Sequence, residues 1–171
     1  KLKKKGFTLV EVLVVSVIFM ILMQAVYSFF IRNIKIANDE KNKAYIDNQA
    51  KTVMDNIGQC LKNSWQDTID TVDKKDTSKG IELEIPQDKN SSVYEGSNSD
   101  LYRFEMDSER KAVKVTKKEG KSEDTEYVLS GYVDDFTITK DGSFIAIKLK
   151  VDYKIRDLNR EFKLDYNIRK D

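Results

Sequence analysis

Residues 3–31 read KKKGFTLVEVLVVSVIFMILMQAVYSFFI, and this stretch determines what the N-terminal part of the chain can become. Residues 12–31 carry no charged side chain. Twenty helical residues rise about 30 Å, which is the thickness of the hydrocarbon core of a bilayer. A buried core helix is the weaker interpretation, because so small a domain rarely covers twenty successive residues on every face. The stretch therefore predicts a membrane-inserting helix, whose backbone satisfies its own hydrogen bonds in lipid.

The composition of the 171-residue chain restricts its chemistry. Charged residues make up 35%, the net charge is +1, and the charges lie almost entirely outside the apolar stretch. The sequence has no His, which excludes a histidine-based triad or metal site. The single cysteine, Cys60, excludes an internal disulfide and a cysteine zinc cluster. A generally basic nucleic-acid-binding surface is not indicated, although a local patch remains compatible with the sequence.

Motifs for catalysis and cofactor binding are also missing from the sequence. It contains no phosphate-binding loop, no nucleophile elbow and no dinucleotide fingerprint. Acidic pairs such as Asp134 and Asp135 could touch calcium, but they lack the ligand spacing of an EF-hand loop. We therefore predict no catalytic residue, no metal site, no cofactor and no enzymatic activity.

Glu11 is the exceptional residue of the apolar segment. A carboxylate within lipid costs a few kcal/mol, so its presence favours a functional role. Glu11 lies four residues, or one helical turn, after Phe7. If the mature chain began at Phe7, its ammonium could pair with a Glu11 carboxylate between neighbouring subunits. The alternative is a first-turn glutamate near the lipid headgroups, stabilised by the helix dipole, in a plain signal anchor.

Lys3 to Glu11, KKKGFTLVE, closely resembles the class III signal of type IV pilins and pseudopilins. The resemblance implies that a prepilin peptidase cleaves after Gly6 and N-methylates Phe7. It also implies that Glu11 pairs with the N-terminus of a neighbouring subunit during assembly. Many major pilins have helix-breaking Gly and Pro where this chain has Met20 and Ser28, so the resemblance does not imply a melted helix segment here.

The resemblance further divides the N-terminal region and places it in the cell. Residues 1–6 are expected to be a cleaved leader, and residues 7–31 a transmembrane and filament-core helix. Lysines and arginines on the two sides of the span are balanced, so the cytoplasmic placement of the N-terminus rests on the leader. The expected partners are prepilin peptidase, other major and minor pilins, and the cytoplasmic membrane before assembly into a pilus at the cell surface.

A second helical pattern follows the apolar segment. Apolar residues recur at helical spacing, and their stripe comprises Ile46, Ala50, Val53, Ile57 and either Cys60 or Leu61. These positions share one face of a helix, so residues 32–63 are predicted to be amphipathic. Because the only proline is Pro86, we expect one helix over residues 7–63. Cys60 is interpreted as a small buried apolar residue of this face.

Residues 64–171 show the two-residue alternation of half-buried strands. The alternating segments are 81–85, 102–106, 113–115, 127–138, 145–155 and 162–168. Segments 66–80 and 87–100 are predicted to be loops. The fold class is therefore α+β, with a long N-terminal helix packed on an antiparallel sheet, which is similar to the pilin fold. The final meander from Tyr127 to Asp171 resembles that of J- or W-type minor pilins.

Three functions remain in competition at the level of sequence. The first is a structural minor pilin of a type IV pilus, in its initiation or tip complex. The alternative is a pseudopilin of a type II secretion or DNA-uptake filament that binds cargo. A membrane-anchored enzyme is the third, and the missing histidine and motifs argue against it.

Overall fold

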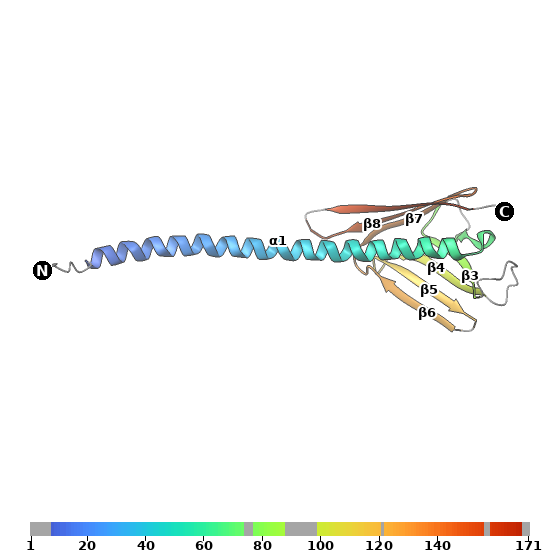
Figure 1. Cartoon of the computed structure of the whole chain (residues 1–171), viewed down its shortest axis with the longest axis horizontal. Helices are drawn as coiled ribbons and strands as arrows, with labels where there is room; N and C mark the ends of the chain where they lie inside the picture. The colour runs from blue at the N-terminus through green and yellow to red at the C-terminus, as the bar shows by residue number, and fades with distance from the viewer. Residues whose placement is uncertain (1–7, 74–76, 88–98, 121, 156–157, 169–171) are drawn as a thin grey trace. The chain divides into compact units, whose positions relative to one another are not determined.

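The computed structural model describes residues 8–73, 77–87, 99–120, 122–155 and 158–168. The chain divides into two compact units, Lys1–Asn42 and Lys43–Asp171. Helix α1 (Leu9–Asn63) starts in the first unit and ends in the second without interruption (Figure 1). The single long helix predicted from the sequence is therefore confirmed from Leu9 onward.

The C-terminal end of α1 is closed by polar groups that follow it. The amide of Ser64 donates to the carbonyl of Cys60 at 2.9 Å, and the Ser64 hydroxyl donates to the carbonyl of Leu61 at 3.0 Å. The side-chain amide of Gln66 also donates to the Leu61 carbonyl, at 3.3 Å. These donors satisfy carbonyl groups that have no partner within the helix, which explains why α1 ends here.

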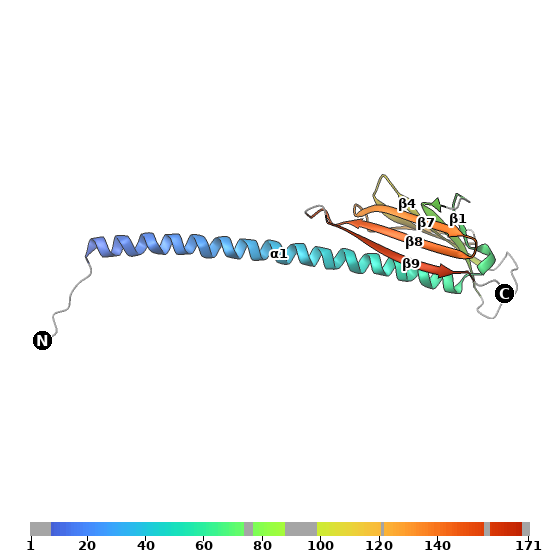
Figure 2. The ribbon, with the colours of Figure 1, turned by 90° about the horizontal axis from the view of Figure 1, so that it is seen from above.

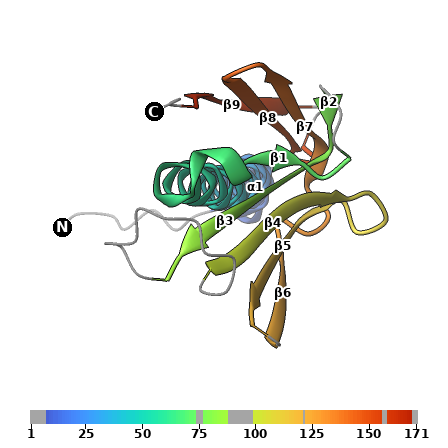
Figure 3. The same cartoon turned by 90° about the vertical axis from the view of Figure 1, so that its right-hand side faces the viewer.

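One face of α1 in the second unit is buried. Its fully buried residues are Ile46, Ala50, Val53, Met54, Ile57 and Leu61. The predicted stripe is confirmed, with Leu61 rather than Cys60 at its end. Met54 was not predicted, and it widens the stripe because sheets cover the helix from two sides. Figure 3 shows this arrangement, with α1 lying between two groups of strands.

The strands form two antiparallel sheets. The first sheet has the order β1-β3-β4-β5-β6 and contains β1 (Asp70–Thr71), β3 (Gly80–Pro86), β4 (Ser99–Asp107), β5 (Ala112–Glu119) and β6 (Ser122–Val128). The second sheet has the order β2-β7-β8-β9 and contains β2 (Thr77–Ser78), β7 (Val133–Asp141), β8 (Phe144–Asp152) and β9 (Asn159–Asn167) (Figure 2). The α+β class and the packing of a long helix on antiparallel sheets are confirmed, and they match the pilin fold.

The division into two sheets differs from the single sheet that we expected. The predicted final meander is split, because β6 pairs with β5 and only β7, β8 and β9 form the meander. The break falls at Leu129 and Gly131, which have φ values of 57° and 83°. Two residues in the left-handed region so close together turn the chain out of the first sheet. The alternation of apolar and polar residues shows that a segment is a strand, but it does not show which other strand that segment pairs with.

Segment 66–80 was predicted to be a loop without a core element, and this prediction was wrong. It contains a short 3-10 helix (Gln66–Thr68) and strands β1 and β2, which pair with β3 and β7 respectively. Ile69 is 1% exposed, and Thr71 and Ser78 are also buried. The segment therefore supplies one edge strand to each sheet. Strands of two residues are too short to show a period of two.

The β8–β9 hairpin is shorter than the alternation suggested. β8 ends at Asp152 rather than Ile155, because Lys154 adopts a φ of 56°. Tyr153 remains 7% exposed and belongs to the core. The core of the second unit combines residues of α1, both sheets and the connecting segments, and its largest fully buried side chain is Phe136.

Candidate functional site

The N-terminal segment is the candidate site for processing and assembly. Gly6 and Phe7, the predicted cleavage and methylation residues, lie outside the described residues, which begin at Thr8. Glu11 lies in the first turn of α1. The structure therefore describes the carboxylate of the predicted assembly site but not its predicted partner.

Thr8 and Glu11 form a reciprocal cap at the start of α1. The backbone amide of Thr8 donates to Glu11 Oε2 at 2.9 Å, and the Thr8 hydroxyl donates to the same oxygen at 3.1 Å. The backbone amide of Glu11 donates to the Thr8 hydroxyl oxygen at 3.3 Å. This is a capping box, which satisfies amides that a helix start leaves without partners. This role of Thr8 was not predicted, although a threonine followed three residues later by a glutamate is the usual sequence signature of a capping box.

The capping box fixes where the Glu11 carboxylate lies. Its Oε2 accepts a hydrogen bond from the backbone amide of Thr8. Thr8 directly follows Phe7 in the sequence. Among the described residues, Oε1 accepts no hydrogen bond. The carboxylate is thus held one peptide bond from the predicted mature N-terminus, with one oxygen available to a further donor.

The apolar part of α1 has no partner within the first unit. Its large apolar side chains between Leu9 and Ile31 are exposed, from 48% at Val17 to 82% at Leu9. By length and composition, α1 can cross a membrane. Such a surface is unfavourable in water at about 25 cal/mol per Å² of apolar area. It therefore requires lipid or the apolar helices of other subunits.

The second unit contains a groove between α1 and the first sheet. Its volume is about 510 Å³. The helical wall carries a row of polar side chains one turn apart, namely Gln49, Thr52, Asn56, Gln59 and Asn63. The floor is largely apolar and consists of Ile85, Tyr102, Phe104, Val115 and Val128, with Glu126 beside them. Figure 3 shows β3 next to α1 and β6 further from it, at the other edge of the first sheet.

Cys60 lies in the wall of this groove and is half-buried. The interpretation of Cys60 as a small buried apolar residue is confirmed only in part, because Cys60 packs against the core but is not completely covered. Burial raises the pKa of the Cys60 thiol to about 11. The thiol is then protonated at neutral pH, which makes it a poor nucleophile.

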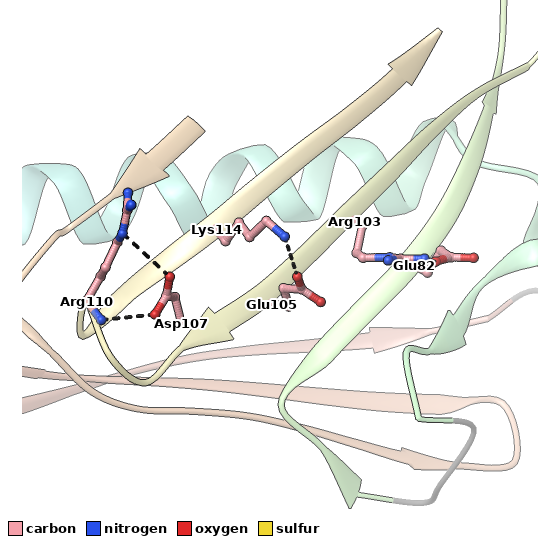
Figure 4. A network of polar contacts seen from close by, with 6 residues as sticks. All are labelled: Glu82, Arg103, Glu105, Asp107, Arg110 and Lys114. Atoms are coloured by element: carbon pink, nitrogen blue, oxygen red, sulfur yellow. Dashed lines mark hydrogen bonds and ion pairs between the residues drawn. The ribbon is translucent and has the colours of Figure 1, made fainter. Parts of the chain in front are cut away.

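The outer face of the first sheet carries ion pairs between neighbouring strands (Figure 4). Arg103 Nη2 lies 2.5 Å from Glu82 Oε2, and Lys114 Nζ lies 2.9 Å from Glu105 Oε1. The pKa of Arg103 is raised, chiefly by its hydrogen bond to Glu82. These pairs join residues that are opposite one another in the β-sheet register. Opposite charges in such positions stabilise strand pairing, so this face has a structural role.

The last hairpin carries charges of both signs. Lys150 Nζ lies 2.6 Å from Asp134 Oδ2, and Lys163 Nζ lies 3.6 Å from Glu161 Oε1. The pKa of Asp134 is lowered, chiefly by its hydrogen bond to Lys150. Within the described part of the chain, no group of three or more His, Cys, Asp or Glu residues could hold a metal ion.

Comparison with known proteins identifies the N-terminal segment. Residues 1–27 match the family model of the prokaryotic N-terminal methylation motif. No curated protein and no solved structure matches the chain. The match covers the segment that contains Gly6, Phe7 and Glu11, and the J or W subtype is not part of it.

The fold and the N-terminal segment together define a class of protein. The chain has a signal of this type, and its first helix is long and apolar enough to cross a membrane. This combination fits a single-pass membrane protein that later becomes part of a filament. The motif is the signal of type IV pilins and pseudopilins, and it implies processing by prepilin peptidase and assembly with other pilins. Signal and fold therefore point to a structural subunit.

Proposed function

We propose that this chain is a minor subunit of a type IV pilus that acts in the initiation or tip complex. The observation that supports it most is the methylation motif at residues 1–27 on a chain whose first helix is exposed and apolar. Prepilin peptidase cleaves between Gly6 and Phe7 and N-methylates Phe7. The mature subunit stays in the cytoplasmic membrane until its apolar helix packs with those of other pilins.

The Glu11 carboxylate is the group that directs docking in this proposal. Its Oε2 is held by Thr8, and its Oε1 accepts the ammonium of a methylated Phe7 on a neighbouring subunit. A charge pair gains most where water is excluded, as between packed apolar helices. A subunit without this carboxylate would leave the neighbour's ammonium buried and unpaired, which is costly.

The test is incorporation of a Glu11→Ala chain into filaments. Removing a carboxylate makes insertion into lipid easier, so membrane insertion and cleavage of the variant should be normal. Pull-down with the companion pilins should then show a loss of incorporation of about tenfold or more. The matched control is Gln24→Ala, which removes a different polar side chain from the same exposed segment and should incorporate normally.

Undiminished incorporation of Glu11→Ala would leave Glu11 as a helix-capping residue and would overturn the proposed docking. A pseudopilin of a secretion or DNA-uptake filament has the same signal, so it would give the same result in this assay. Finding the tagged chain in extended surface pili, rather than in an envelope-confined filament, separates these two functions.

A further inference from the structure

β6 is an open edge of the first sheet. It is the last strand in the order β1-β3-β4-β5-β6, and it pairs with β5 in an unbroken register from Ser122 to Val128. Proline and β-bulges, which often protect the edges of sheets, are absent from this strand. All of its residues except Val128 are exposed. Its outward backbone groups can therefore pair with a further strand.

The charge of β6 is only partly balanced, because Glu123 lies close enough to Arg103 and Lys114 to add to the raised pKa of both. Glu123, Asp124 and Glu126 form no ion pair among the described residues. Carboxylates on the neighbouring strands are paired, at Asp100–Lys117 (3.2 Å), Glu105–Lys114 (2.9 Å) and Glu119–Lys117 (3.2 Å). Lys117 lies opposite Asp124 in the register, but it forms its ion pairs with Asp100 and Glu119. Lys118 lies opposite Glu123 and forms no ion pair among the described residues, so one such cation accompanies the three β6 carboxylates. The edge therefore keeps an excess of negative charge.

We propose that the edge of β6 binds a basic, extended segment of a neighbouring polypeptide, which joins the first sheet as a sixth strand. Main-chain hydrogen bonds along the edge supply the pairing. Because successive side chains point to opposite faces, Glu123 lies on one face and Asp124 and Glu126 on the other. A segment with cations on both faces matches this distribution, and opposite charges on adjacent strands favour pairing.

The groove leaves space on the inner face of the edge. Glu126 and Val128 line the groove together with Val115 of β5, in a part of the sheet that α1 does not fill. Long basic side chains of an added strand can therefore reach Glu126 without displacing the helix. This recognition lies in the second unit and in a different segment from Glu11, so it adds a partner surface to the proposed function and does not depend on it.

The test uses the purified full chain in lipid nanodiscs and two synthetic nine-residue peptides. One peptide repeats Lys-Lys-Val-Val, which places lysines on both faces of an added strand, and the other repeats Glu-Glu-Val-Val. Labelled peptide reports affinity by fluorescence anisotropy, and hydrogen exchange reports protection of β6 amides. We expect the lysine peptide to bind, to slow exchange of alternate β6 amides about tenfold or more, and to weaken as salt is raised. The glutamate peptide should do neither.

A triple variant, Glu123→Gln, Asp124→Asn and Glu126→Gln, should lower the affinity for the lysine peptide about tenfold. The matched control is Glu109→Gln, Asp141→Asn and Asp165→Asn, which removes the same charge from exposed residues elsewhere in the second unit and should bind normally. Circular dichroism confirms that both variants are folded. Equal binding by the two triple variants, or binding without protection of β6, would overturn the proposal. The β6 carboxylates would then only keep the edge from pairing with other strands.

Discussion

Asp47 on α1 accepts a hydrogen bond from the hydroxyl of Tyr153, which lies 106 positions further along the chain. The other Asp47 oxygen, Oδ2, accepts a hydrogen bond from Arg160 Nη1 at 2.5 Å. Tyr153 follows β8 and Arg160 belongs to β9, so both ends of the hairpin turn are bound to one carboxylate on the helix. This contact holds the second sheet against α1 within the second unit.

A fragment comprising residues 32–171 should be soluble and folded on its own. The buried core begins at Ile46 and contains no residue of the exposed apolar run. Far-ultraviolet circular dichroism should show both helix and strand, and denaturation should be cooperative. A fragment that is unfolded by this measurement would contradict the division of the chain into an apolar anchor and an independent body.

Asp47→Ala should lower the free energy of unfolding of this fragment by about 1–3 kcal/mol, because the buried Tyr153 hydroxyl loses its partner. The Arg160 contact adds little, since its side chain is 52% exposed and solvent screens it. Urea denaturation measures the change. Asp55→Ala, at an exposed position of the same helix, is the control and should change stability by less than about 0.5 kcal/mol.

Stability should also fall at high pH because of Tyr153. Burial and the Asp47 contact raise the pKa of Tyr153 from 10.0 to about 12. Between these values the unfolded chain has lost the phenolic proton and the folded chain retains it. The stabilisation is therefore complete below pH 10 and is lost as the pH rises to about 12.

The measurement for this pH effect is the difference in unfolding free energy between the native fragment and Tyr153→Phe. The difference should be constant up to about pH 9 and should shrink above pH 10. Lysines titrate in the same range, but they are common to both proteins and cancel in the difference. A difference that stays constant to pH 12 would show that this hydroxyl does not carry the effect.

Processing should depend on the size of residue 6. Because the peptidase has to accommodate this side chain at the cleavage point, Gly6→Leu should block cleavage, whereas Gly6→Ala should be partly tolerated. Intact mass from peptidase-positive cells should give a native chain that begins at Phe7 and carries one methyl group. Normal filaments from Gly6→Leu, or a native chain that keeps its lysine leader, would argue against the processing proposed here.

Much of the architecture followed from periodicity in the sequence. The uncharged run from 12 to 31 and the stripe from Ile46 to Leu61 predicted one long helix, and the structure has α1 from Leu9 to Asn63. The alternating segments predicted most of the strands. Side chains return to the same face every 3.6 residues in a helix and every two residues in a strand. When one face is buried, apolar residues therefore recur at that spacing within the segment itself.

The sequence alone therefore determined the long helix, most of the longer strands, which faces are apolar, and the N-terminal signal. Only the tertiary structure decided that the strands form two sheets, that segment 66–80 supplies a strand to each, and that Asp47 meets Tyr153. It also decided that β6 is left as an acidic edge. The physical reason is that periodicity records whether a face is covered but not which distant segment covers it. That choice depends on the packing of the whole chain, through contacts that span a hundred residues.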